Sequence, residues 1–290
     1  MPNKDENKKI GFESSVPIEK IWSKFENGTL DSKFCIPLGE NDKGEDITIS
    51  LDSASHILAA GGPFPDVTNY KHVVLSTLLR FNKPDDLKLI LIDLMEIYFN
   101  DYNDIDNRLI FPIASEYDET MNILEWVNRE ISRRQDILKK NNIRNIETYN
   151  NNNLDNIIPK IVILFSDSDC FVDYSGKAWD YEKGWIDQKA WKLVMDILMK
   201  SKNVGIHLIM TMENASKKTI PSSLRENIAT KIAFRTQKEE DSCAILGHAD
   251  AEKLTGLNDM IVKCDYFGEE LKMQGYYFDE ENIKKLVPKN

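Results

Sequence analysis

The sequence lacks the features that mark membrane-spanning, metal-binding and disulfide-stabilised proteins. No apolar run among its 290 residues approaches the ~20 residues needed to cross a bilayer. It has four cysteines and four histidines, without a Cys-x-x-Cys pair or a histidine at metal-ligand spacing. Residues 1–6 are polar and do not resemble a secretory signal. We therefore expect a soluble chain with free thiols in a reducing cytosol.

Positive charge is also scarce. The chain carries 37 Lys and Arg against 48 Asp and Glu, a net charge of -11. Domains that grip nucleic acid usually present a basic face, so this balance argues against nucleic acid as the main partner. The hydrophobic share of 41% and the charged share of 29% are typical of a globular domain with a sizeable core.

Short apolar runs alternate with amphipathic segments along most of the chain. Residues 1–30 form a polar lead-in that we expect to be loosely packed, with one amphipathic stretch, Ile18 to Phe25, that can dock on a globular domain of residues 31–290. The pattern predicts a β-hairpin at 34–38 and 47–51, a closing antiparallel pair at 261–263 and 273–278, and further strands at 56–60, 87–93, 161–165, 206–210 and 231–235. It predicts helices at 68–81, 118–140 (capped by Asp118), 188–200, 239–246 and 250–254. Residues 141–156 are expected to form an asparagine-rich loop. Continuous apolar strands are typical of a parallel sheet covered on both faces, which predicts a three-layer α/β domain.

The turn after the first parallel strand looks like a phosphate-binding loop that has lost its key residues. Such a loop reads Gly-x-x-x-x-Gly-Lys-Ser/Thr, with backbone N–H groups and the lysine on phosphate and the hydroxyl on Mg²⁺. Here Thr68 takes the hydroxyl position, Val67 stands where lysine belongs, and Asp66 stands where the last glycine belongs. Pro63 and Pro65 each remove a backbone donor. The remaining loop glycines, which are weak indicators by themselves, are Gly61 and Gly62.

Motifs outside this loop resemble the FtsK/SpoIIIE family of P-loop ATPases. They lie at residues 84–93, 125–134, 144–150, 205–209, 225–235 and 241–260. The resemblance covers about residues 37 to 287. It implies a RecA-like P-loop NTPase fold, with a mostly parallel central sheet, helices on both faces and a small antiparallel addition.

The positions that carry catalysis in this family depart from its pattern. The resemblance implies an Asp-Glu pair that holds Mg²⁺ and activates water, where this chain has Ser166 and Asp167. It also implies a sensor glutamine where this chain has Glu213, and an arginine where it has Cys243. These changes predict a degenerate ATPase domain that has kept its fold without efficient hydrolysis. No firm cofactor is expected; if Mg-ATP binds weakly, Thr68 and Asp167 would hold the metal.

Degenerate domains of this family occur in membrane-anchored coupling proteins of type VII secretion, and this acidic, asparagine-rich sequence is similar to the C-terminal domain of the EssC type. The resemblance implies a cytoplasmic domain of a bacterial cell-membrane protein. Its partners would be sister ATPase domains of the same chain and secreted WXG100-like or other effector proteins, with a hexamer as one candidate assembly. The alternative is an active ATP-dependent translocase of protein, or of DNA, with an atypical phosphate loop.

The segment between Cys170 and Trp191 is rich in aromatic residues. Trp179, Tyr181 and Trp185 are candidates for a partner-binding surface, because tryptophan and tyrosine are enriched at binding hot spots. The alternative is that these side chains pack the segment onto its own domain.

Two further expectations concern single side chains. His56 and His207 lie in apolar strands and are expected in the core, whereas His72 and His248 are expected at the surface. Phe64, in a loop stiffened by prolines, is expected to fold inward and fill the vacated nucleotide cleft.

Overall fold

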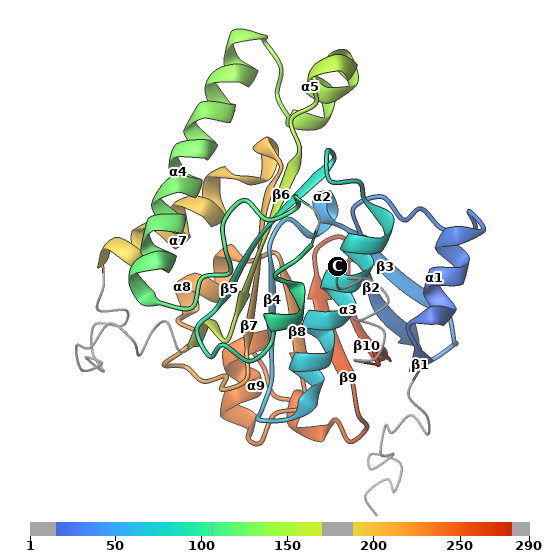
Figure 1. The fold of residues 1–290 in the computed structure, drawn as a ribbon. Helices are drawn as coiled ribbons and strands as arrows, with labels where there is room; N and C mark the ends of the chain where they lie inside the picture. The colour runs from blue at the N-terminus through green and yellow to red at the C-terminus, as the bar shows by residue number, and fades with distance from the viewer. Residues whose placement is uncertain (1–15, 106, 170–187, 280–290) are drawn as a thin grey trace, which may run out of the picture.

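The structure, a computed structural model, describes residues 16–105, 107–169 and 188–279, which form a sheet covered by helices on both faces (Figure 1). The strands are β1 (Val16–Pro17), β2 (Cys35–Asn41), β3 (Asp46–Ser50), β4 (Ile57–Ala60), β5 (Leu87–Asp93), β6 (Lys160–Ser166), β7 (Ile206–Met212), β8 (Thr230–Phe234), β9 (Asp259–Cys264) and β10 (Glu270–Tyr277). The helices are α1 (Glu19–Glu26), α2 (Leu51–Ala54), α3 (Pro65–Phe81), α4 (Tyr117–Lys140), α5 (Ile146–Asn152), α7 (Gln188–Lys200), α8 (Ser222–Asn227) and α9 (Glu239–Leu246). Short 3₁₀ turns lie at Asn100–Tyr102, Leu154–Asn156, Lys202–Val204 and Ala251–Lys253.

The sheet has a parallel half and an antiparallel half. Its strand order is β3-β2-β10-β9-β8-β4-β7-β6-β5. The five strands from β8 to β5 are parallel, whereas β9, β10, β2 and β3 are joined to β8 and to one another antiparallel. The predicted α/β architecture is confirmed, and the antiparallel addition is larger than predicted because the β2–β3 hairpin joins the same sheet through β10.

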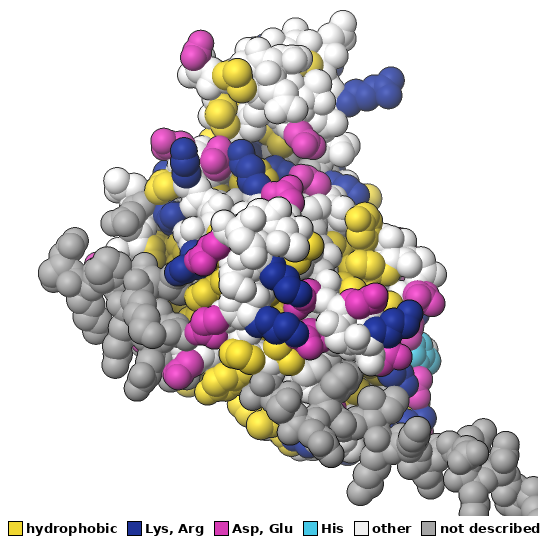
Figure 2. Space-filling view, turned by 90° about the vertical axis from the view of Figure 1, so that its right-hand side faces the viewer, with side chains coloured by type: hydrophobic (Ala, Val, Ile, Leu, Met, Phe, Trp, Pro, Cys, Tyr) yellow, Lys and Arg dark blue, Asp and Glu magenta, His cyan; other side chains and the backbone are white. Residues whose placement is uncertain are grey.

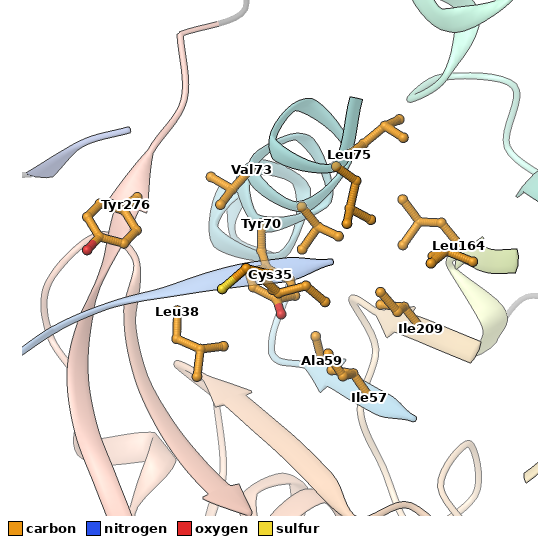
Figure 3. Close-up of a cluster of buried hydrophobic side chains, with 14 of the residues drawn as sticks. Cys35, Leu38, Ile57, Ala59, Tyr70, Val73, Leu75, Leu164, Ile209 and Tyr276 are labelled. Carbon is orange, nitrogen blue, oxygen red and sulfur yellow. The ribbon is translucent and has the colours of Figure 1, made fainter. Parts of the chain in front are cut away.

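The core lies on both sides of the sheet, as the continuous apolar strands predicted. In β4, Ile57 and Ala59 belong to the cluster under α1 and α3, whereas Leu58 and Ala60 belong to the cluster under α4, α7, α8 and α9. Figure 3 shows the first cluster, in which side chains of α3 lie over those of the central strands. None of the helices in the described ranges combines the length and apolarity needed to cross a membrane.

The described part of the lead-in belongs to this core. Ile21, Trp22 and Phe25 on α1 are buried, and the Trp22 indole N–H donates to the Thr77 hydroxyl on α3 at 3.0 Å. Strand β1 pairs in parallel with β10. The predicted docking of the amphipathic stretch is confirmed, and the expectation that the lead-in is loosely packed is wrong for Ile18 to Phe25.

Two helices begin earlier than predicted because of their capping residues. Helix α3 begins at Pro65 rather than at Thr68, since proline suits a first helical position. Helix α4 begins at Tyr117, and its cap is a reciprocal box formed by Glu116 and Glu119 rather than by Asp118.

The asparagine-rich segment is not only a loop. It contains α5, whose first turn is capped by the Asn145 side chain accepting the Thr148 N–H at 2.8 Å. Asparagine at a helix N-cap is as favourable as aspartate or serine, so composition alone was misleading here.

The histidines are buried more often than predicted. His56 accepts a backbone N–H at 3.0 Å and His207 donates to a backbone carbonyl at 2.9 Å, which confirms that both are core residues with partners. The expectation that His72 lies at the surface is wrong: it is buried, stacks between Tyr102 and Phe278, and makes a 3.0 Å hydrogen bond with the Tyr102 hydroxyl.

Candidate functional site

Three of the residues singled out in the sequence meet at the carboxyl ends of the parallel strands, where open α/β sheets usually bind ligands. Asp167 follows β6, Glu213 follows β7, and Thr68 lies in the first turn of α3, which follows β4. The Thr68 hydroxyl donates to Glu213 Oε1 at 2.7 Å.

A buried lysine lies at the centre of this cluster. Lys71 Nζ is 3.1 Å from Asp167 Oδ2 and 3.4 Å from Glu213 Oε1, and the lysine side chain is fully buried. It also lies 3.4 Å from the centre of the Tyr98 ring, and the Tyr98 hydroxyl donates to Glu213 Oε1 at 3.2 Å. Glu213 Oε1 therefore accepts from a hydroxyl of α3, an ammonium of α3 and a phenol of the segment after β5.

The carboxyl groups after β6 are electrostatically strained. Asp167 has a left-handed φ of 46°, and its Oδ2 also accepts the Ser166 hydroxyl at 2.8 Å. Burial raises the pKa of Asp167, although the Lys71 ammonium and the Ser166 hydroxyl oppose that rise. Burial and the charge of Asp167 raise the pKa of Asp169 to about 7. These carboxyl groups favour a positive charge at this edge of the sheet, and the Lys71 ammonium supplies it.

The backbone of the loop at residues 61–65 makes its hydrogen bonds inside the protein. The Gly61 N–H donates to the last carbonyl of β7 at 3.1 Å, and the Gly62 N–H donates to the carbonyl just after β8 at 2.8 Å. The Phe64 N–H donates to the Gly62 carbonyl at 2.8 Å. Pro63 and Pro65 have no N–H. Each donor between residues 61 and 65 therefore already has a protein acceptor.

Packing within the protein accounts for the two loop glycines. A Cβ on Gly62 would come within 2.9 Å of the Phe64 ring, and one on Gly61 would come within 3.0 Å of the Phe234 Cβ. The Phe64 ring is half-buried, and the Arg235 guanidinium lies 3.9 Å from its centre. Phe64 thus turns back onto its own loop beneath Arg235; that it fills a nucleotide cleft stays a prediction.

The next two loop positions point into the protein. Asp66 is buried, and its Oδ1 accepts the Asn258 N–H at 2.8 Å, which ties α3 to the segment before β9. Burial raises the pKa of Asp66 despite this hydrogen bond. Val67, where the sequence resemblance implies a lysine, is fully buried in the core under α3.

Of the other candidate residues, Ser166 joins this cluster through the hydrogen bond from its hydroxyl to Asp167. Cys243 lies on α9, and within the described ranges no hydrogen bond or ion pair joins its side chain to Thr68, Asp167 or Glu213. The candidate partner-binding residues, which lie outside the described residues, are Trp179, Tyr181 and Trp185. Across the part of the chain that the structure describes, no group of three His, Cys, Asp or Glu side chains is placed to hold a metal ion.

Sequence reasoning missed Lys71 and Tyr98. A signal for Lys71 was present: it lies four residues after Val67 and three before Val74, so it shares a helix face with two buried valines. A lysine in an apolar stripe indicates a buried charge that needs a partner. Tyr98 lies in an irregular segment with no comparable pattern.

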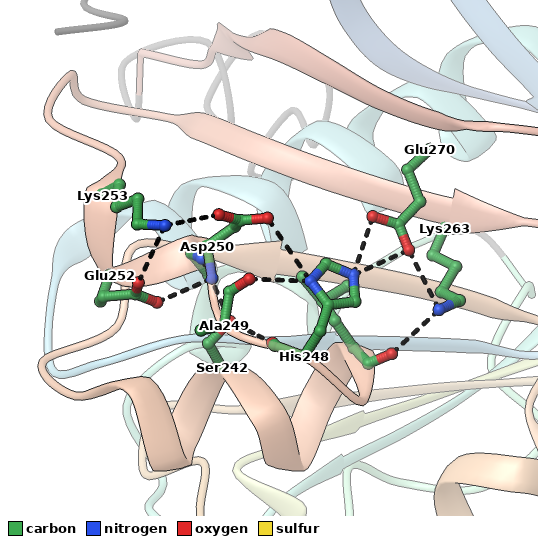
Figure 4. Close-up of polar contacts among 10 residues, drawn as sticks. Ser242, His248, Ala249, Asp250, Glu252, Lys253, Lys263 and Glu270 are labelled. Atoms are coloured by element: carbon green, nitrogen blue, oxygen red, sulfur yellow. Dashed lines mark hydrogen bonds and ion pairs between the residues drawn. The ribbon is translucent and has the colours of Figure 1, made fainter. Parts of the chain in front are cut away.

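A second polar cluster lies between the end of α9 and the β9–β10 pair (Figure 4). His248 Nε2 is 2.9 Å from the Glu270 carboxylate, which also pairs with Lys263 at 3.0 Å. Burial opposes protonation of His248, but hydrogen bonds to the Ala249 carbonyl and to Glu270 outweigh it and raise its pKa. These groups are partly exposed and satisfy one another, so we assign them a role in joining α9 to the sheet.

Solved structures with a similar fold include a type VII secretion ATPase and a conjugation coupling protein. The cytoplasmic domain of the Thermomonospora curvata type VII secretion ATPase EccC superposes with a TM-score of 0.74 at 15% identity, over 96% of this chain and 35% of that one. EssC (ATPases 2 and 3) from Geobacillus thermodenitrificans superposes with a TM-score of 0.71 at 14% identity, over 99% of this chain and 51% of that one. A further EccC structure, a complex with a signal sequence peptide, gives a TM-score of 0.67 at 12% identity over 92% of this chain and 44% of that one. These likenesses establish the fold, that of RecA-like P-loop ATPases.

Sequence relatives are DNA translocases. The DNA translocase FtsK of Staphylococcus aureus (strain Mu50) is 28% identical over 293 aligned residues, which cover 96% of this chain. This chain spans about a third of that relative's length, 35%. The FtsK/SpoIIIE family model matches residues 20–257, so the chain belongs to the FtsK/SpoIIIE family.

Proposed function

We propose that this domain is a non-hydrolysing member of its family, and that it works in a membrane-anchored coupling protein of type VII secretion by contacting sister ATPase domains and secreted protein substrates. The observation that carries the first part is the hydrogen bonding of residues 61–65. A phosphate-binding loop acts through N–H groups that are free to point at the ligand. Here Gly61, Gly62 and Phe64 donate to protein carbonyls instead.

The magnitude of this loss is large enough to matter. A hydrogen bond to a charged group contributes about 1.5–3 kcal/mol. Micromolar and millimolar dissociation constants differ by about 4 kcal/mol, which corresponds to two such bonds. Occupying two or three donors therefore moves a micromolar site into the millimolar range, before the missing lysine is considered.

The residues present do not fit a bound Mg-nucleotide. Val67 is in the core and contributes no charge, and the carboxylate of Asp66 is held against the Asn258 backbone. Lys71 neutralises the carboxylates after β6 and β7 where a metal would be needed.

The secretion role is supported by charge as well as by fold. EccC and EssC structures share the fold, and one EccC structure is a complex with a signal sequence peptide. The net charge of this chain is -11, and on the face drawn in Figure 2 acidic and basic side chains are interspersed rather than gathered into a basic field. A DNA-gripping domain would need such a field to neutralise phosphates. The proposed location is the cytoplasmic side of the bacterial cell membrane, with the membrane reached through other parts of a longer chain.

A second candidate is an active translocase with an atypical loop. It is favoured by the convergence of Thr68, Asp167 and Glu213 at one strand edge. Its DNA-moving form is supported by the FtsK relatives but opposed by the charge.

Calorimetric titration with Mg-ATP, with phosphate release measured on the same sample, separates the two candidates. The expected result is no heat of binding at micromolar nucleotide and no turnover, with the motor domain of the Staphylococcus aureus FtsK as the positive control. Micromolar binding together with hydrolysis would refute the non-hydrolysing assignment. For the secretion role, deletion of the domain from its parent gene should abolish export of secreted substrates and leave chromosome segregation unchanged.

A further inference from the structure

Lys71 has an environment that is unusual for lysine. Its side chain is fully buried, although lysine is almost never buried unless paired. Its ammonium meets one oxygen of Asp167, one oxygen of Glu213 and the face of the Tyr98 ring. These contacts come from β6, β7 and the segment after β5, so one charge on α3 joins three other parts of the fold.

The oxygens around this ammonium are those that would suit a hard divalent cation. Carboxylate and hydroxyl oxygens are the preferred ligands of Mg²⁺ and Mn²⁺. Asp167 and Thr68 are the two residues of this chain that would hold the metal if Mg-ATP bound, and both are linked here through Glu213 or Lys71. A second cation cannot enter next to the ammonium without strong repulsion in a buried site.

We propose that Lys71 is a built-in cation that occupies the metal position between Asp167 and Glu213, so that this edge of the sheet is closed without nucleotide or metal. This inference rests on the proposed non-hydrolysing function and deepens it by naming what replaces the metal. On this proposal, the carboxylates of Asp167 and Glu213 could bind a metal cation if the Lys71 ammonium did not occupy the space between them.

Removing the ammonium should expose that site. In a Lys71→Ala variant, Asp167 and Glu213 lose their shared positive partner, and the space left by the lysine stem admits an ion. The variant should therefore gain affinity for Mn²⁺, which combines an oxygen-ligand preference with a spectroscopic signal.

The experiment is a titration of Mn²⁺ alone, followed by electron paramagnetic resonance and by thermal unfolding, on the wild type, Lys71→Ala and Lys71→Ala/Asp167→Asn. We expect Lys71→Ala to bind Mn²⁺ at least about tenfold more tightly than the other two proteins, which corresponds to about 1.4 kcal/mol. Its melting temperature should rise with Mn²⁺, whereas those of the wild type and the double variant should not.

Two outcomes would overturn the proposal. One is binding of Mn²⁺ by the wild type that Asp167→Asn abolishes, because the site would then be open. The other is an equal response of Lys71→Ala and the double variant. If Lys71→Ala does not fold, the triple variant Lys71→Ala/Asp167→Asn/Glu213→Gln should recover folding, since no charge is left unpaired; failure to recover would show that the lysine does not act as a counter-ion.

This result is independent of the nucleotide titration. No ATP is present, so Mn²⁺ binding by the wild type would refute the built-in cation alone. Micromolar Mg-ATP binding with turnover would refute the proposed function, whatever the Mn²⁺ titration gives.

Discussion

Replacing Val67 by the lysine that the family resemblance implies should lower the free energy of unfolding of this domain and should not restore ATP binding. In the Val67→Lys variant, the new side chain starts from a fully buried position under α3. The carboxylate of Asp167 is already paired with Lys71, which lies one turn further along the same helix face. The new ammonium therefore has no partner and must either become neutral or disrupt the core.

The cost of neutralising it sets the magnitude. Lysine has an ordinary pKa of about 10.4, and the difference of about 3.4 from pH 7 corresponds to about 4.6 kcal/mol. That is a large share of the roughly 5–15 kcal/mol by which a domain is stable. The matched control is Val67→Met, which adds volume without charge and should cost only about 1–3 kcal/mol. Urea unfolding at pH 7 and at pH 10.5 measures both, and the excess penalty of Val67→Lys should largely disappear at the higher pH, where about half of the lysine is already neutral in the unfolded chain.

The nucleotide arm of the same experiment tests the loop. Calorimetry should show less than about a tenfold gain in Mg-ATP affinity for Val67→Lys, an energy below about 1.4 kcal/mol, because the N–H groups of Gly61, Gly62 and Phe64 remain occupied. The reasoning would be refuted by a variant as stable as Val67→Met that also binds Mg-ATP in the micromolar range. That result would mean that position 67 can face the loop and that the missing lysine alone had prevented binding.

Other predictions concern stability. Burial lowers the pKa of His56 to about 3 and the pKa values of His72 and His207 to about 4, so folding favours the neutral forms of all three side chains. The free energy of unfolding should therefore have its full value above pH 6.5 and should fall as the pH drops toward 4. The fall should be up to about 1.4 kcal/mol per pH unit for each histidine. Urea midpoints between pH 7 and 4.5 measure this, and His72→Gln should make the fall shallower. His248 has the opposite sign: its raised pKa gives a contribution that is complete at low pH and lost as pH rises through that pKa, which NMR titration of the imidazole would follow. Trp22→Ala should lower the free energy of unfolding by about 3–5 kcal/mol because the side chain is buried, with Trp22→Phe as the milder control; a change near zero would mean that α1 is not part of the cooperative core.

The fold was largely predictable because its signals are local. Strand β5 ends at Asp93 as predicted, and α7 and α9 have the predicted bounds. The spacing of apolar residues, and the polar residues that flank each apolar segment, determine where these elements begin and end. The errors were also local but depended on capping geometry. Asn145 starts a helix in a segment whose composition suggested a loop, and Pro65 starts α3 before its apolar face begins.

The chemistry of the site could be predicted only in part, because its contacts are distant in sequence. The sequence shows that the loop lacks lysine and carries two prolines, but the acceptors of the Gly61 and Gly62 N–H groups lie at the end of β7 and just after β8, about 150 and about 170 residues away in the chain. The partners of Lys71 are 96 and 142 residues away. A lysine on an apolar helix face indicates that the fold contains a partner for its charge. Only the packed structure identifies which carboxylates are that partner.

Glu213 and Lys71 stabilise each other's charge. Family resemblance implies a neutral glutamine at position 213, which would leave Lys71 paired with Asp167 alone. The glutamate supplies a second negative partner, and one of its oxygens accepts from Thr68, Lys71 and Tyr98 together, a load that suits a carboxylate because it is an acceptor only. Lys71 offsets only one of the two negative charges of Asp167 and Glu213, and the remaining charge would repel a phosphate charge 4 Å away by about 4 kcal/mol near a protein surface. The pair that holds α3 against the strand ends therefore also opposes a nucleotide, and we infer that recovery of ATP binding requires changes in the loop and in this cluster together.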